Sequence, residues 1–400
     1  MPLLLVLATS CGSSDTKEKS AKSSDSDAYA FVDQAIERSA ANYKAMLALN
    51  GNADSIPRSI HNDGRLYLVD TKNWTSGFFA GSLWYLYEAT QDSFWLSEAK
   101  RWTENLEGVQ RQTNTHDIGF IAYCSYGNGL RLTGDDHYVE VLNNTALTLS
   151  HRFNPNVGCT KSWNRYKFSE KWQFPVIIDN MMNLELLLFS AKNTTNSNLL
   201  NIATSHASTT MNNHFRDDYS SYHVIDYDSI TGEVIQKNTH QGLYDSSSWA
   251  RGQTWGLYGF TFCARETSNQ DYLNQAKSIA NYIMTNPLIP EDKIPLWDYM
   301  DAREKAPRDA SAAALTASAL LELSQLVEDE LADSYIDYAT DILRTLSSDA
   351  YLNRTGENHN FIILHCTGNH PKGTEIDKPL NYGDYYFLEA LLKLKKLKAA

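Results

Sequence analysis

The chain has 400 residues, of which 42% are hydrophobic and 12% aromatic, including nine Trp and 23 Tyr. This composition is sufficient for a large folded core and excludes an intrinsically disordered protein. The formal net charge is −13, with 48 acidic against 35 basic residues, which excludes nucleic acid as a partner because its binding requires clustered Lys and Arg.

The first 27 residues predict an export signal and a tether. The opening MPLLLVLATSC is an apolar run that ends in small residues before Cys11, and residues 12–27 are rich in Ser, Asp and Lys. This order resembles a bacterial lipoprotein signal, with lipid added to the cysteine thiol, although no Lys or Arg precedes the apolar run. A plain cleaved signal peptide is the alternative. We expect a protein of the bacterial periplasm or cell surface, attached to a membrane only through a lipid on Cys11, with one folded domain over residues 28–400.

Beyond residue 28, two kinds of helical segment alternate. One kind is apolar nearly all round, which is typical of buried helices, and covers residues 75–89, 118–132, 179–191, 249–265, 309–326 and 383–397. The other kind is amphipathic and covers residues 29–48, 93–109, 136–150, 198–212, 271–285 and 332–347. Six inner and six outer helices that close into a ring form an (α/α)6 barrel, so the predicted fold class is all-α. The alternative is a helical solenoid, which would not need inner helices this apolar.

The links between helices differ in length at the two ends of the predicted barrel. The longest, 151–178 and 213–248, each lead from an outer helix to the next inner helix. The second contains SYHVIDYDSITGEVIQKN, two alternating runs around a glycine-containing turn, which predicts a β-hairpin. Since long loops gathered at one end of a scaffold commonly build its site, we expect the site where the inner helices begin.

Two inner helices open with a carboxylate. Asp117 stands in THDIGF and Asp179 in PVIIDNMMNL. An aspartate at a helix start is first of all an N-cap. However, the apolar residues before Asp179 would raise its pKa by desolvation, and Gly119 leaves room for a ligand beside Asp117. Two acids at one mouth suit general acid/base catalysis on a sugar.

A third inner helix opens with SSWARGQTWG, in which Arg251 and Trp255 are four residues apart and share a face. A buried arginine needs a partner, so Arg251 is either paired with an Asp or Glu or is a fork for the substrate or the acid, with Trp255 as a stacking face. His223, His240 and Gln241 lie in the 213–248 loop and are expected near the same mouth.

Six ordered motifs make the chain resemble the unsaturated glucuronyl hydrolases, glycoside hydrolase family 88, over about residues 30–397. They are NWTSGFFAG, HDIGF, IDNMMNLELL, HQGL, SSSWARGQTWGLYGF and EIDKPLNYGDYYFLEALLKL. The resemblance implies hydration of the C4=C5 bond of an unsaturated uronate on an oligosaccharide, without a metal or organic cofactor. It implies that Asp179 protonates C4 and that Asp117 tunes this acid. Trp74, His116, His223, Gln241, Arg251 and Trp255 fall where the family lines its substrate pocket.

Three alternatives stay open at this point. An unsaturated rhamnogalacturonyl hydrolase would share the fold and the reaction, a sugar epimerase would use paired histidines, and a glycan-binding lipoprotein would need neither aspartate. In LHCTGNHPKG the family often has serines that contact the next sugar or its sulfate, where this chain has Cys366 and Asn369, with Lys372 as a nearby cation. The parent polysaccharide, for example a glycosaminoglycan or ulvan, is left open by the sequence.

Overall fold

The computed structural model describes residues 29–164 and 171–399, so Cys11 lies outside the described residues. The inner helices are α3 (Ser76–Thr90), α5 and α6 (Ile118–Ala122 and Asn128–Thr133), α8 (Leu184–Thr194), α10 (Ala250–Thr267), α12 (Ala310–Leu323) and α14 (Asn381–Ala399). The outer helices are α2 (Ala30–Leu49), α4 (Ser93–Glu104), α7 (Asp136–Ser150), α9 (Ser197–Asn213), α11 (Gln270–Thr285) and α13 (Asp329–Leu346). These thirteen helices occupy the twelve predicted segments, with α5 and α6 sharing one.

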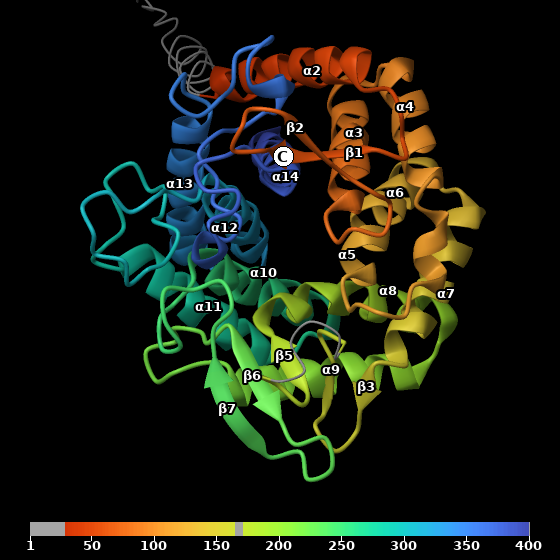
Figure 1. Cartoon of the computed structure of the whole chain (residues 1–400), viewed down its shortest axis with the longest axis vertical. Helices are drawn as coiled ribbons and strands as arrows, with labels where there is room; N and C mark the ends of the chain where they lie inside the picture. Colours follow the sequence, from red (N-terminus) through yellow and green to blue (C-terminus); the bar gives the residue numbers. More distant parts are fainter. Residues whose placement is uncertain (1–28, 165–170, 400) are drawn as a thin grey trace, which may run out of the picture.

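The helices close into a double ring (Figure 1). The inner ring is continuous, since α14 contacts α3 as well as α12, and α10 contacts both α8 and α12. The outer helix α2 lies against α14, as expected for the helix left to pair with the last inner segment. Small residues allow this packing: a Cβ at Gly77 of α3 would lie 2.4 Å from the Ile121 carbonyl oxygen of α5. The (α/α)6 barrel is confirmed, and its closure excludes an open solenoid.

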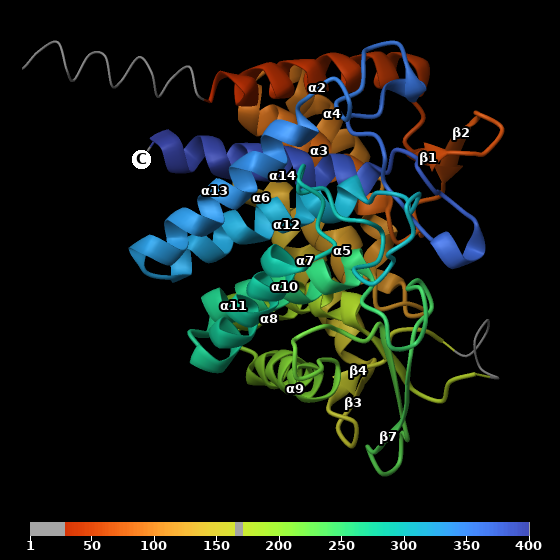
Figure 2. The same ribbon diagram turned by 90° about the vertical axis from the view of Figure 1, so that its left-hand side faces the viewer.

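The strands gather at the end of the barrel where the inner helices begin, opposite the C-terminus (Figure 2). They are β1 (Ile56–Ile60), β2 (Leu66–Val69), β3 (Phe153–Asn154), β4 (Cys159–Thr160), β5 (Pro175–Ile177), β6 (Val224–Tyr227) and β7 (Val234–Asn238). β6 and β7 pair as the predicted hairpin, and β5 adds to it antiparallel, giving the order β5-β6-β7.

Three local features depart from the predicted pattern. The β1–β2 hairpin was not predicted, although its Asp63-Gly64 turn, with Gly64 at φ +87°, is a turn signal. The second inner segment is interrupted by a π-helical turn, Tyr123–Gly127, between α5 and α6. The third begins as a 3-10 helix, Ile178–Asn183, directly after β5. The 3-10 helix carries Asp179, whereas the π-helical turn is separated from Asp117 by α5.

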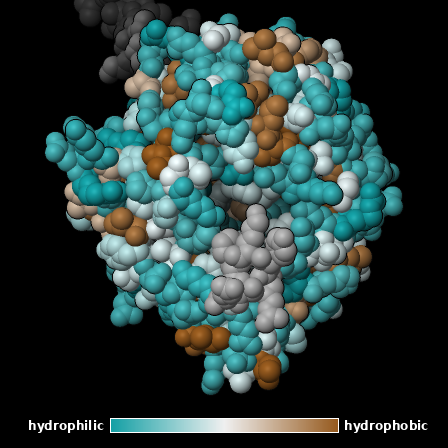
Figure 3. Space-filling view, viewed as in Figure 1, coloured by the Kyte–Doolittle hydropathy of each residue, from teal (hydrophilic) through white to brown (hydrophobic). Residues whose placement is uncertain are grey.

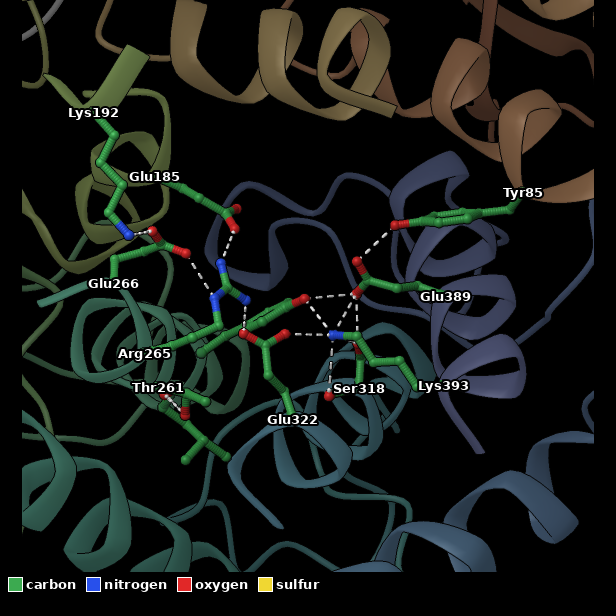
Figure 4. A network of polar contacts seen from close by, with 12 residues as sticks. Tyr85, Glu185, Lys192, Thr261, Arg265, Glu266, Ser318, Glu322, Glu389 and Lys393 are labelled. Atoms are coloured by element: carbon green, nitrogen blue, oxygen red, sulfur yellow. Dashed lines mark hydrogen bonds and ion pairs between the residues drawn. The ribbon is translucent and has the colours of Figure 1, made fainter. Parts of the chain in front are cut away.

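The opposite end of the barrel holds a cavity of about 480 Å³ that is lined by a network of charged side chains (Figure 4). Arg265 of α10 pairs with Glu185 of α8 and Glu322 of α12. Lys393 of α14 pairs with Glu322 and with Glu389. These ion pairs connect four inner helices, α8, α10, α12 and α14.

Two further features concern the cysteines and the membrane. Cys124, Cys263 and Cys366 are buried free thiols. Within the part of the chain that the structure describes, none of the helices is long and apolar enough to cross a bilayer.

Candidate active site

A cavity of about 310 Å³ opens at the end of the barrel that carries the strands. Its lining is polar and aromatic and consists of Arg58, Tyr67, Trp74, His116, Asp117, Trp163, Ile177, Asp179, His240, Gln241, Trp249, Gly368, Asn369, Lys372, Thr374, Glu375 and Tyr382. The face that carries it is largely hydrophilic and is hollowed near its centre (Figure 3). The cavity combines aromatic rings with two histidines and three carboxyl groups, those of Asp117, Asp179 and Glu375.

Asp179 is a carboxyl group of this cavity whose pKa is strongly raised. It lies in the first turn of the 3-10 helix after β5, and the side chain is 12% exposed. Burial raises the pKa of Asp179 to about 7, while the positive charge of Arg251 acts in the opposite direction and the charge of Asp117 adds to the rise. Asp117 stands at the N-cap position of α5 but makes no side-chain cap hydrogen bond, and Asp179 lies inside the 3-10 helix, whose N-cap is Ile177. A carboxyl with this pKa can donate a proton near neutral pH.

His223 lies behind Asp179 with its Nε2 atom 3.7 Å from Oδ2 of the carboxyl group. Its Nδ1 atom accepts the backbone N–H groups of His240 and Gln241, both at 3.1 Å. Burial lowers the pKa of His223 well below its usual value, so the ring is neutral. Since Nδ1 is an acceptor, the proton sits on Nε2 and points toward Asp179.

His116 and Asp117 form a similar pair on the other side of the cavity. His116 Nε2 lies 3.3 Å from Asp117 Oδ1, and Thr115 donates a 2.7 Å hydrogen bond to Oδ2. Asn183 accepts the Phe120 N–H through its oxygen, so its amide nitrogen, 3.2 Å from Nδ1 of His116, is the donor there. His116 therefore also carries its proton on Nε2, and burial lowers its pKa.

Gly119 does not leave room for a ligand, contrary to our expectation. A Cβ at this position would lie 2.5 Å from Oδ1 and 2.8 Å from Cα of Asn183. The glycine instead allows α5 to approach the 3-10 helix that carries Asp179. Gly119 thereby keeps the elements that carry the two aspartates close together. The prediction that it leaves room for a ligand is wrong.

Comparisons with known proteins point to one family. A protein of Formosa agariphila named unsaturated glucuronyl hydrolase is 46% identical over 348 residues, 86% of each chain. A crystal structure of an unsaturated glucuronyl hydrolase specific for heparin superposes with a TM-score of 0.89 at 47% identity, covering 92% of this chain and 98% of the other. A Streptococcus agalactiae protein named unsaturated chondroitin disaccharide hydrolase is 30% identical over 91% of this chain and 92% of its own. No protein-family model matches the chain.

The chain belongs to the unsaturated glucuronyl hydrolases, glycoside hydrolase family 88. Five of the residues predicted for the pocket line the cavity of this protein: Trp74, His116, Asp117, Asp179 and Gln241. His223 stands directly behind Asp179, at the start of β6. Asn369 and Lys372 also line the cavity, whereas Cys366 is fully buried away from it.

Trp255 and Arg251 have surroundings that differ from the prediction. Trp255 is fully buried against Phe120 and Tyr386, so it offers no stacking face to the cavity. Its indole N–H has no regular hydrogen-bond partner among the described residues, but it faces Asp179 and lowers the pKa of that carboxyl. The predicted stacking role of Trp255 is therefore corrected to a buried role beside the acid.

Arg251 is paired with protein groups rather than directed into the cavity. Its Nη1 atom lies 2.7 Å from Oδ2 of Asp309 and donates to the Thr367 carbonyl, and Nη2 donates to the Gly368 carbonyl at 2.6 Å. Arg251 was predicted either to pair with an acidic residue or to bind the substrate or the catalytic acid. The structure shows the first of these, with Asp309 as the partner. Arg251 nevertheless influences the acid through its charge.

Several cavity residues were missed by sequence reasoning. Arg58, Tyr67, Trp163, Glu375 and Tyr382 all line it. Arg58 and Tyr67 lie on the unpredicted β1–β2 hairpin, and Glu375 and Tyr382 stand in the last motif without a distinguishing local pattern. Among residues 29–164 and 171–399, no three His, Cys, Asp or Glu side chains are grouped so that they could hold a metal ion.

Proposed function

We propose that this protein removes the 4-deoxy-unsaturated glucuronic acid from the non-reducing end of oligosaccharides generated by polysaccharide lyases. The observation that carries the proposal is the buried Asp179 carboxyl, with a pKa of about 7, in a cavity lined by aromatic rings. The family to which the chain belongs supports the same activity. A sugar epimerase that uses paired histidines is not favoured, because burial lowers the pKa values of both His116 and His223.

In the proposed reaction Asp179 is the general acid. Its carboxyl proton adds to C4 of the C4=C5 double bond, and the resulting carboxylate draws a proton from the water whose oxygen binds C5. This restores the acid and gives a hemiketal at C5. The hemiketal opens as the bond between C5 and the ring oxygen breaks, which gives a ketone at C5 and a hemiacetal at C1. The hemiacetal then collapses to an aldehyde at C1 and expels the neighbouring sugar as an alcohol. Neutral His223 donates toward Asp179, and Asp117 holds the sugar hydroxyls and keeps the pKa of the acid high.

We propose a glycosaminoglycan or a sulfated algal glucuronan such as ulvan as the parent polysaccharide. One solved relative is specific for heparin and another relative is named for chondroitin disaccharides. The test is to incubate the protein with disaccharides produced by heparin, chondroitin, hyaluronan, ulvan and rhamnogalacturonan lyases. Turnover is measured as the loss of the ultraviolet absorbance of the conjugated uronate. Turnover of the glucuronyl substrates supports the proposal. Activity confined to the rhamnogalacturonan product, or no activity on the panel, contradicts it.

The pKa of Asp179 predicts the alkaline limb of the pH profile. A general acid is active only when protonated, so kcat/KM should fall about ten-fold per pH unit above the pKa of the free enzyme. We therefore expect the midpoint of this limb at about pH 7. Initial rates at low substrate concentration between pH 5 and pH 9 measure it. A profile that stays flat to about pH 9 would rule out Asp179 as the proton donor.

We also propose that Cys11 carries lipid and anchors the enzyme in the periplasm or at the bacterial cell surface. The support is the apolar run with small residues before Cys11 and the polar residues after it. Mass spectrometry of the mature N-terminus from the native host tests this proposal. A diacylglyceryl cysteine at the new N-terminus supports it, and cleavage elsewhere or an unmodified Cys11 contradicts it.

A further inference from the structure

We propose that Arg58 and Glu375 form a clamp that positions the mouth of the cavity for substrate binding without taking part in the chemistry. The proposal rests on the proposed function only for its kinetic test. It assigns a role to two cavity residues that carry no part of the proposed proton transfer. Both belong to segments that reach the cavity from outside the barrel.

The pair is buried and has two parallel contacts. Arg58 Nε lies 2.7 Å from Oε1 of Glu375, and Nη2 lies 2.8 Å from Oε2. The side chains are 13% and 8% exposed, so solvent screens their attraction much less than it would at the surface. A planar guanidinium that binds both oxygens of a carboxylate fixes orientation as well as distance. The pair is therefore a geometric connection between the two segments.

Arg58 reaches the cavity through an irregularity of its strand. The register of β1 against β2 shifts between Pro57 and Ser59, so Arg58 is the extra residue of a β-bulge. Bulges beside active sites redirect a side chain. The Arg58 Nη1 atom donates to Asn73 Oδ1 at 3.2 Å, and the guanidinium lies 5.7 Å from the ring centre of Trp74. One side chain thus contacts the β1–β2 hairpin, the segment that begins α3 and, through Glu375, the 366–378 segment.

Glu375 belongs to the 366–378 segment, which folds back on itself through bridges between Cys366 and Lys378 and between Asn369 and Thr374. Glu375 has a left-handed backbone, with φ +55°, and its side chain packs on Gly368. A Cβ at Gly368 would lie 2.7 Å from the Glu375 Oε2 atom, so only glycine admits this arrangement.

The 366–378 segment is held from two sides. Arg251 of α10 binds the carbonyl oxygens of Thr367 and Gly368 from the barrel interior. Arg58 binds Glu375 from the β1–β2 hairpin. Between these attachments the segment brings Asn369 and Lys372 to the cavity. Loss of the Arg58 attachment removes the link between the segment and the hairpin and leaves the Arg251 attachment intact.

The charges of Arg58 and Glu375 distinguish a clamp from a site that binds the carboxylate of the substrate. The charge of Glu375 cancels that of Arg58, and the two terminal nitrogens and Nε of Arg58 already contact protein oxygens. If the pair is a clamp, removal of either partner weakens substrate binding. If Arg58 were instead the site of the substrate carboxylate, removal of Glu375 would strengthen binding and removal of Arg58 would weaken it.

The test compares Arg58→Ala, Glu375→Ala and the double variant in the full chain, with an unsaturated disaccharide that the wild type cleaves. We expect KM to rise about ten-fold in each single variant and no further in the double variant, because the two residues act as one unit. The value of kcat and the alkaline limb should not change, since Arg251 and Asp117 are the charges that act most strongly on Asp179. Arg58→Lys keeps the charge but loses the fork, and should raise KM in the same direction.

Arg65→Ala is the matched control, because Arg65 pairs with Asp63 on the same hairpin but both side chains are exposed, 78% and 53%. It should leave KM and kcat unchanged. Additive KM effects, opposite effects of Arg58→Ala and Glu375→Ala, or a loss of kcat at unchanged KM each overturn the clamp. Hydrogen exchange of residues 366–378 needs no substrate and should become faster in both single variants. Unchanged exchange overturns the clamp, whereas inactivity of the wild type on every lyase product overturns only the proposed function.

Discussion

Replacement of Asp179 by Asn should reduce kcat by about 10²- to 10⁴-fold, because the amide has nearly the same shape but cannot donate the proton to C4. Asp179 is not the N-cap of its 3-10 helix, which is Ile177, and an amide oxygen can still accept the backbone hydrogen bond that the carboxyl receives. Steady-state assays with an unsaturated disaccharide measure the effect. A variant that keeps more than about a tenth of the wild-type kcat would exclude Asp179 as the general acid.

The same substitution should stabilise the protein at alkaline pH. The carboxyl ionises with a pKa near 3.8 when unfolded and about 7 when folded, so its ionisation favours the unfolded state as the pH rises. This cost is absent below about pH 4, grows up to about pH 7 and is constant above it. Asp179→Asn removes the cost, so we expect a higher thermal midpoint at pH 8 and no difference at pH 4.

Glu185→Gln is the control for this stability effect. Glu185 lies in the charged network at the opposite end of the barrel, and burial also raises its pKa to about 7. The substitution should weaken the loss of stability with rising pH while leaving kcat unchanged. The quantity compared is the thermal midpoint of Asp179→Asn minus that of the wild type at the same pH. If this difference is lower at pH 8 than at pH 4, the carboxylate stabilises the fold.

Replacement of Arg251 by Ala should destabilise the protein by about 3–5 kcal/mol, because it leaves a buried carboxylate without its partner. Asp309 is fully buried, and its Oδ2 atom lies 2.7 Å from Nη1 of Arg251. The substitution also removes the hydrogen bonds to the Thr367 and Gly368 carbonyls. Urea unfolding measures the free energy, and we expect the midpoint to fall clearly below that of the wild type.

The double variant Arg251→Ala/Asp309→Asn separates charge from packing. Asn at position 309 can still accept from the Ser311 N–H group at the start of α12, but it leaves no buried charge. The double variant should therefore recover part of the stability that Arg251→Ala loses. Two results would show that the buried pair does not stabilise the fold. One is a urea midpoint of Arg251→Ala equal to that of the wild type. The other is a double variant that is less stable than Arg251→Ala.

Much of the fold could be predicted because the inner helices are apolar on every face. Segments such as 309–326 have no polar face to present to solvent, so only a closed barrel buries them. The β1–β2 hairpin was missed despite its Asp63-Gly64 turn, since its strands have only five and four residues. The acids were found because the residues before Asp179 are apolar, which is a local signal. Both acids were also placed by the resemblance of their motifs to the family.

The surroundings of Arg251, Trp255 and Gly119 depend on long-range contacts and could not be predicted. The partner of Arg251 is Asp309, 58 residues further along the chain. Trp255 shares a helix face with Arg251, but that face packs against Phe120 and Tyr386 from other inner helices. Gly119 was interpreted from its position beside an acid, whereas its neighbour in space is Asn183. A helical spacing shows which residues share a face, but not what that face meets.

The central claim is that Asp179 donates a proton to C4 of the unsaturated uronate before the glycosidic bond breaks. The most direct test is to run the reaction in heavy water and examine the released uronate by NMR spectroscopy and mass spectrometry. Hydration of the vinyl ether predicts one deuterium at C4 and no cleavage of the corresponding saturated glucuronide. A product without deuterium at C4, or efficient cleavage of the saturated glucuronide, would contradict the account.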